Sequence, residues 1–144
     1  MRRLNKTVAI YSFITVFLFL VGVVYHIFGR GVYSLAMNNV FVYPLFFGVF
    51  FTMILMRYEQ KVSFANTTGY RIYFNLFGAG IALLSTHSFF TGMFEIAGTD
   101  SRFLPFFLYI GIVLLVVGFI IICLTISGRK RMQAAAMRRK ARYK

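Results

Sequence analysis

The sequence has very few acidic residues and little charge of any kind. Among its 144 residues only three are Asp or Glu, against 16 Lys and Arg, and charged residues make up 13% of the chain. A soluble domain of this size needs more charged residues to cover its surface, and a disordered chain needs low hydrophobicity. Because 60% of these residues are hydrophobic, both classes are excluded.

Residues that build catalytic and metal sites are also scarce. The one cysteine, Cys123, excludes an intramolecular disulfide and a multi-cysteine zinc site. The sequence contains no Walker loop, no GxGxxG, no HExxH and no nucleophile elbow. Its long apolar runs hold no carboxylate of the kind that a proton-coupled antiporter uses. The sequence therefore favours a non-enzymatic role.

The chain does contain four long apolar runs that are free of Lys, Arg, Asp and Glu. A hydrocarbon core of about 30 Å is crossed by a helix of roughly 20 residues, and backbone amides without hydrogen bonds are too costly there for isolated strands. We therefore expect an all-α membrane protein with four transmembrane helices. The runs cover residues 8–28, 40–56, 72–90 and 103–126, and a basic tail follows over 127–144.

The basic residues indicate the orientation of these helices. All of them except Arg30 and Arg102 lie at the amino end, in the middle loop or in the tail. Since cytoplasmic connections are enriched in Lys and Arg, the pattern predicts a multi-pass protein of the cell membrane with both termini in the cytoplasm. Residues 34–36 resemble a signal-peptide cleavage site, but the apolar run before them is longer than the core of a typical signal peptide.

Two scarce residue types share one spacing. His26 and His87 are 61 positions apart, and so are Pro44 and Pro105. A shift of 61 places the first apolar run on the third and the second on the fourth. This spacing predicts two tandem helical hairpins related by a pseudo-two-fold axis along the membrane normal, with coincidence as the alternative.

Small and polar residues recur on one face of several predicted helices. Gly111, Gly118 and Thr125 follow a heptad in the last run, and Pro44, Gly48 and Thr52 are spaced by four in the second. In the third run the stripe contains Asn75, Ala79, Ala82 and Thr86. In the first run the stripe contains Ser12, Thr15, Phe19, Gly22 and His26. Because small residues let helices approach closely in lipid, we interpret the stripes of the first, third and last runs as packing faces. Pro44 fits the first turn of its helix, where a missing N–H costs nothing.

His26 and His87 are the side chains near the apolar runs that best suit metal or proton chemistry. They could bind haem iron from opposite sides, share a transition metal with Glu95, or line a pH-sensitive vestibule. The structural alternative is that both rings satisfy their nitrogens at the headgroup boundary. His87 lies about 100° from the Asn75 stripe on its own helix, which weakens a shared interior site.

The tail predicts topological anchoring and contact with anionic lipid headgroups, and RNA or an acidic protein partner is the alternative. The tail should continue the last helix, since Gln133 and the three alanines after it favour helix. The predicted lipid-binding residues are Arg129, Lys130, Arg131, Arg138, Arg139 and Lys140.

Four helices scarcely enclose a path for a solute, so a transport role requires several chains. The sequence thus predicts an accessory subunit or small-solute permeation module that acts in a homo-oligomer or a larger membrane complex. The alternative function is a membrane redox protein that binds haem or a metal through His26 and His87.

Overall fold

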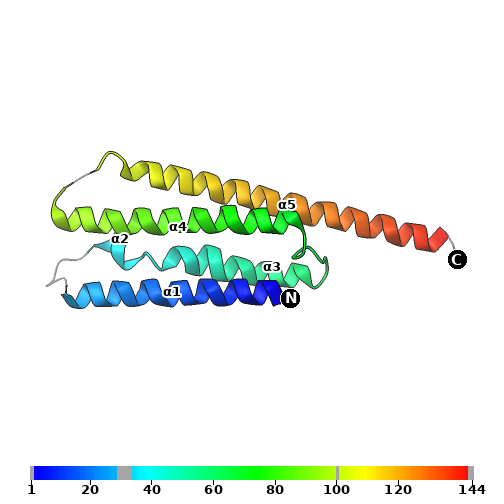
Figure 1. Ribbon diagram of the computed structural model, residues 1–144, viewed down its shortest axis with the longest axis horizontal. Coiled ribbons are helices and arrows are strands. Elements are labelled where there is room, and N and C mark those ends of the chain that lie inside the picture. The colour runs from blue at the N-terminus through cyan, green and yellow to red at the C-terminus, as the bar shows by residue number, and fades with distance from the viewer. Residues whose placement is uncertain (1, 29–33, 100, 143–144) are drawn as a thin grey trace.

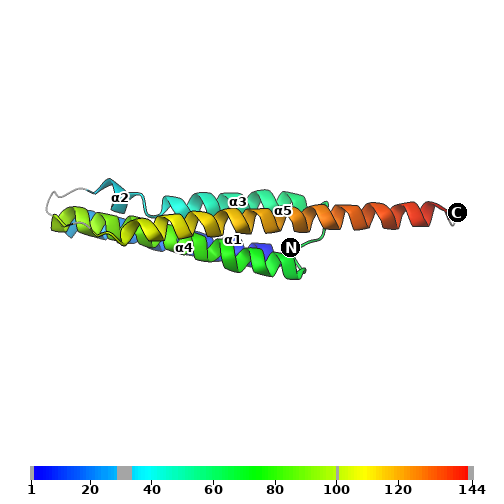
Figure 2. The same cartoon turned by 90° about the horizontal axis from the view of Figure 1, so that it is seen from above.

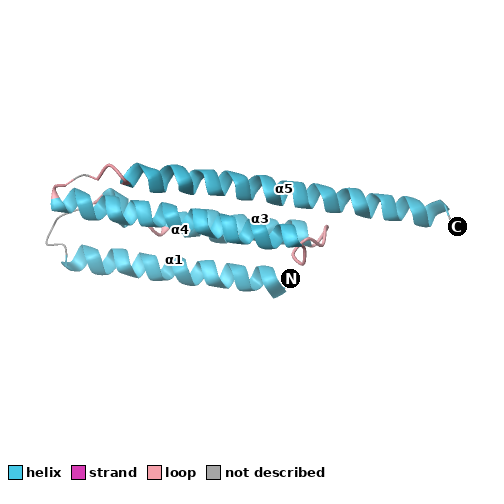
Figure 3. Cartoon of the chain, turned by 45° about the horizontal axis from the view of Figure 1, so that its top comes forward, coloured by secondary structure: helices cyan, strands magenta, loops and turns pink. Residues whose placement is uncertain are grey.

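The computed structural model describes residues 2–28, 34–99 and 101–142, and these ranges are helical apart from short connections (Figures 1 and 3). The elements in chain order are α1 (Arg2–Phe28), α2 (Leu35–Asn38), η1 (Pro44–Phe50), α3 (Phe51–Glu59), α4 (Thr68–Ala97) and α5 (Leu104–Arg142). The all-α class is therefore confirmed. Arg30 and Asp100, which enter the charge pattern, lie outside the described residues, as does the side chain of Lys140.

The helices run up and down in alternation along one long axis. Figure 1 shows α1 running away from the amino terminus, α2, η1 and α3 returning beside it, α4 running out again and α5 returning. The amino terminus and the connection between α3 and α4 therefore lie at one end of the bundle. We call this the α3–α4 end, and α5 projects beyond it. The carboxyl ends of α1 and α4, the short α2 and the start of α5 lie at the opposite end, which we call the α2 end.

Within the described ranges, three helices are long and apolar enough to cross a membrane: α1, α4 and α5. The second predicted run, 40–56, is not one regular α-helix. It begins in the turn after the four-residue α2, is helical from residue 42 onward, and passes from the π-helical η1 directly into α3. A fourth α-helical span is therefore not confirmed for this segment.

Local chemistry explains the π-helical stretch. Pro44, the first residue of η1, has no N–H to give to the preceding turn. One turn later the ring of Tyr11 from α1 packs against the backbone of Gly48. The hydroxyl of Thr52 donates to the Gly48 carbonyl at 2.6 Å. A π-helical stretch is typical of a helix whose regular bonding is displaced in this way. Pro44, Gly48 and Thr52 are all buried, so the face that their spacing gives them packs inside the chain.

The closest helix pair is α4 with α5, and glycines make it possible. A Cβ added to Gly80 would lie 3.0 Å from the carbonyl oxygen of Gly111, so the two backbones nearly touch. A Cβ on Gly118 would lie 3.2 Å from the ring of Phe77. Small residues permit such close approach between helices in lipid. The packing role predicted for Gly111 and Gly118 is confirmed.

The stripe predicted on the third run behaves differently. Asn75, Ala79 and Ala82 are exposed, and Thr86 is only partly buried. Their interpretation as a packing face within this chain is therefore wrong. The buried face of α4 is instead formed by larger residues such as Tyr73, Phe77 and Leu84, because α5 and η1 approach α4 from that side.

Aromatic side chains fill the interior near the α3–α4 end. Tyr70, Tyr73 and Phe77 follow one another along α4 with ring centroids 5.8 and 5.0 Å apart. Phe51 stacks on Phe77 at 5.2 Å and joins the second arm of the bundle to this row. In the connection between α3 and α4, Phe64 is completely buried. The carboxylate of Glu59 accepts hydrogen bonds from the backbone N–H of Phe64 and Ala65, and these fix the turn.

Candidate functional site

The α2 end is held together by polar contacts between α2 and α4. The hydroxyl of Ser34 donates to the Glu95 carboxylate at 2.5 Å and accepts from the backbone N–H of Met37. The Ser88 hydroxyl donates to the carbonyl of Ala36 at 2.6 Å. These bonds dock the short α2 on the last turns of α4.

Glycine at position 92 completes this docking. A Cβ on Gly92 would lie 2.5 Å from the Cβ of Met37 and 2.9 Å from the Ser34 oxygen, so any side chain there would push α2 away. Sequence reasoning missed the role of Ser34 and assigned Glu95 to a metal instead. No sequence pattern links residues 34 and 95 except the repeat spacing, which by itself does not predict a contact.

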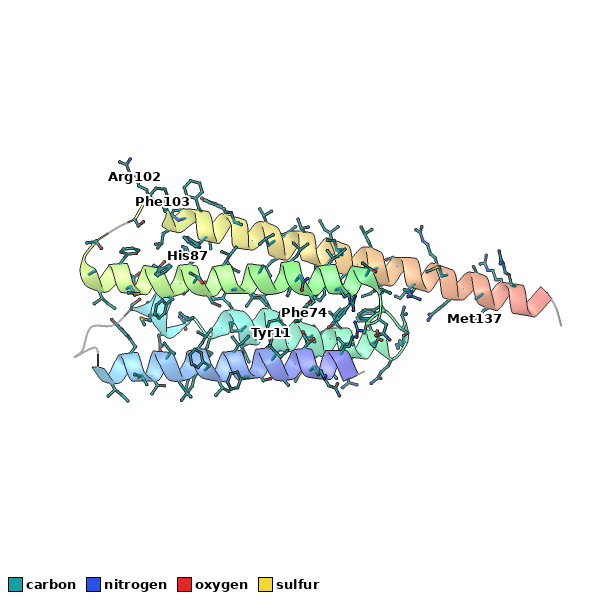
Figure 4. The ribbon with its side chains drawn as sticks, viewed as in Figure 1. Tyr11, Phe74, His87, Arg102, Phe103 and Met137 are labelled. Atoms are coloured by element: carbon teal, nitrogen blue, oxygen red, sulfur yellow. The ribbon has the colours of Figure 1, made fainter. Side chains whose placement is uncertain are left out.

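The two histidines lie on different helices and in different surroundings. His26 is exposed in the last turn of α1. His87 is partly buried in α4, at a position seven residues after Gly80 and three after Leu84. Both of those residues contact α5, so His87 lies on the α5 side of α4 (Figure 4).

This placement gives the predicted haem or metal no visible support. In the ranges that the structure describes, no three His, Cys, Asp or Glu side chains are grouped so as to hold a metal ion. Glu95, the predicted third ligand, has Ser34 as a hydrogen-bond partner. Binding of haem or a metal by His26 and His87 stays a prediction.

A groove lined by basic residues lies between α1 and α4, next to the α3–α4 end. It has a volume of about 370 Å³. Three cations line it, Arg3 and Lys6 from α1 and Arg71 from α4, and all three are exposed. We call it the basic groove. Sequence reasoning used these residues only to predict orientation, because nothing in a linear sequence shows that residues 3 and 71 line one groove.

Long side chains bridge the two walls of the basic groove. The hydroxyls of Thr7 and Tyr70 lie 3.2 Å apart and share a hydrogen bond. Deeper in the bundle, the rings of Tyr11 and Phe74 have centroids 6.2 Å apart, and Figure 4 shows both side chains in the space between α1 and α4. Because α1 and α4 meet here through the ends of long side chains, their backbones stay apart and the basic groove lies between them.

The basic tail continues α5 as a single helix, as predicted. It extends well past the rest of the bundle, as Figure 2 shows from above. Arg131, Arg138 and Arg139 are exposed, and Arg129 is partly buried. The ammonium group of Lys130 lies 5.6 Å from the ring centre of Tyr58, within range of a cation–π interaction.

Comparison of the chain with protein-family models, curated proteins and solved structures gives no match. The functional argument therefore depends on the geometry of this chain.

Proposed function

We propose that this protein is a non-enzymatic subunit of a membrane assembly. The observation that carries the proposal is the contrast between its interior and its outer faces. The core is filled by side chains such as Tyr11, Phe77 and Leu84, which leave little room for a solute to pass through one chain. The outer faces of all long helices carry large apolar side chains, available to lipid or to other helices. A solute path, if the assembly has one, runs between chains.

Photocrosslinking tests the subunit role. A crosslinking amino acid is placed at three exposed apolar positions, Phe13 on α1, Phe50 on η1 and Val116 on α5, with Met137 on the tail as a control. We expect one of the three faces, but not all, to give a discrete protein adduct in native membranes. The adduct mass tells a second copy from a different protein. Lipid adducts alone at all three positions, together with a single-chain particle in mild detergent, would contradict the proposal.

We further propose that the chain crosses the cell membrane four times with both termini in the cytoplasm. The alternating helix directions and the cluster of Lys and Arg at the α3–α4 end support this topology. The second arm supplies the fourth crossing as α2, η1 and α3 in line rather than as one α-helix.

In this orientation the start of the tail, with Arg129, Lys130 and Arg131, lies nearest the inner leaflet, and Arg138 lies roughly 14 Å further along α5 than Arg129. Each Lys or Arg near an anionic surface contributes about 1 kcal/mol, within a Debye length of it. We expect the chain without residues 129–144 to insert normally in the membrane. It should no longer bind added phosphatidylserine vesicles through its cytoplasmic side. The isolated tail peptide should bind such vesicles at low salt and dissociate near 0.5 M salt. Equal binding to neutral phosphatidylcholine vesicles would refute electrostatic recognition of anionic lipid by the tail.

A further inference from the structure

Two grooves lie on the same side of the bundle, one basic and one apolar. The apolar groove has a volume of about 490 Å³ and is lined by α1 side chains between Phe17 and Tyr25, with Met37 and Phe89 on the other side. The basic groove lies nearer the amino terminus, between the same two helices. The lining of the space between α1 and α4 thus changes from cationic to apolar along the bundle.

Helical spacing shows that the two grooves follow one track. On α1 the lining residues Arg3, Ile10, Phe17 and Val24 recur every seven positions and therefore share a face. On α4 Asn75 lines the basic groove and Phe89 the apolar groove, and they are fourteen positions apart.

A small side chain lies on α4 between the two grooves. Halfway between the two α4 lining residues is Ala82, which is exposed. We call the two grooves and this exposed strip of α4 between them the track.

The dimensions suit a lipid. From Lys6 to Phe17, where the apolar groove begins, the α1 helix rises roughly 16 Å at 1.5 Å per residue, and one leaflet of the hydrocarbon core is roughly 15 Å deep. An acyl chain that starts at the basic groove therefore reaches the near end of the apolar groove. The hydroxyls of Thr7 and Tyr70 and the amide of Asn75 add hydrogen-bonding groups beside the cations.

We propose that the track between α1 and α4 is a binding site for one anionic glycerophospholipid. Its phosphate lies between Lys6, Arg3 and Arg71, and an acyl chain lies over Phe74 and Ala82 toward Phe89. Charge complementarity selects this occupant, because a neutral lipid or an apolar helix would leave the three cations without a counter-charge. The inference rests on insertion of the chain in a membrane, and it holds whether or not the protein is a subunit of a larger assembly.

Native mass spectrometry of the full chain in detergent tests the proposal. The probes are phosphatidylglycerol and phosphatidylcholine with identical acyl chains. We expect the chain to retain one phosphatidylglycerol at concentrations about tenfold lower than it needs for phosphatidylcholine. Equal retention of the two lipids would overturn the proposal.

Two variants of equal charge locate the site. The double variant Lys6→Gln with Arg71→Gln should weaken retention of phosphatidylglycerol about tenfold. The matched control, Arg57→Gln with Lys61→Gln, removes one Lys and one Arg from the same end of the molecule and should change retention by less than about twofold. Equal losses of phosphatidylglycerol retention in the two variants would show that the lipid is attracted by charge at any position, and would overturn the proposed site. If the first variant fails to fold, Lys6→Gln alone repeats the test at an exposed position.

Two further arms separate lipid from other occupants. Ala82→Phe fills the middle of the track without changing any charge and should also reduce retention. If it converts a dimer to a monomer instead, the face belongs to a second copy of the chain and the proposal fails. Millimolar inorganic phosphate should not displace the lipid, because it lacks the acyl chain; complete displacement would assign the site to free phosphate. None of these results depends on the crosslinking that tests the subunit role.

Discussion

The ring of Tyr11 lies against the backbone at Gly48, so closely that a Cβ on Gly48 would be 2.6 Å from two of its carbons. This contact joins α1 to the second arm of the bundle at the π-helical segment. The same side chain reaches toward α4, where a Cβ on Gly78 would lie 3.2 Å from the Tyr11 hydroxyl. Tyr11 therefore connects three of the four arms.

Gly48→Ala should destabilise the protein by about 1–3 kcal/mol, because the new methyl group and the Tyr11 ring cannot occupy the same space. Thermal unfolding in detergent, followed by circular dichroism, measures the change. Gly22→Ala is the control, since the nearest atom to its new Cβ would be 4.0 Å away. The control should be neutral or slightly stabilising, as alanine is the better helix former. Equal stability of the two variants would contradict the close contact.

Two serines on α4 should respond in opposite ways to removal of their hydroxyls. Ser88 donates to the carbonyl of Ala36, and Ser88→Ala should cost about 1 kcal/mol. Ser85 is buried, and its hydroxyl has no hydrogen-bond partner within the part of the chain that the structure describes. Ser85→Ala should therefore be neutral or stabilising by up to about 1 kcal/mol. A larger loss for Ser85→Ala than for Ser88→Ala in the same unfolding assay would be evidence against this placement.

The Ser34–Glu95 hydrogen bond predicts energetic coupling between α2 and α4. Ser34→Ala and Glu95→Gln, alone and together, form a double-mutant cycle. We expect a coupling free energy of about 1 kcal/mol, reduced from the value of a buried charged bond because Glu95 is exposed. Additive effects would mean that the two side chains do not interact in the membrane.

Apolar run length and alternating basic clusters were enough to predict the helical class and the location of three long helices. Those signals are local, because a helix in lipid satisfies its own backbone. The π-helical stretch of the second arm was not predicted. Pro44 fits the first turn of an ordinary helix equally well, and its effect here depends on the contact between Gly48 and Tyr11 from another helix.

The candidate sites were harder to predict for the same reason. His26 and His87 were singled out because histidine is scarce in this sequence. The cations that line the basic groove are common residue types, and they come close to one another only in the folded chain. The exposed stripe around Ala82 was misread as a packing face, since small residues favour close helix contact and lipid contact alike. Which one forms is decided by the neighbouring helices.

The number of membrane crossings is tested most directly by cysteine accessibility. In a Cys123→Ser chain, single cysteines at Asn5, Ser63, Thr99 and Met137 are labelled with a membrane-impermeant maleimide in right-side-out and inverted vesicles. Four crossings predict that residues 5, 63 and 137 react from the cytoplasmic side and residue 99 from the opposite side. If residues 5 and 99 react from one side and residues 63 and 137 from the other, the second arm does not cross the membrane and the proposed topology is wrong.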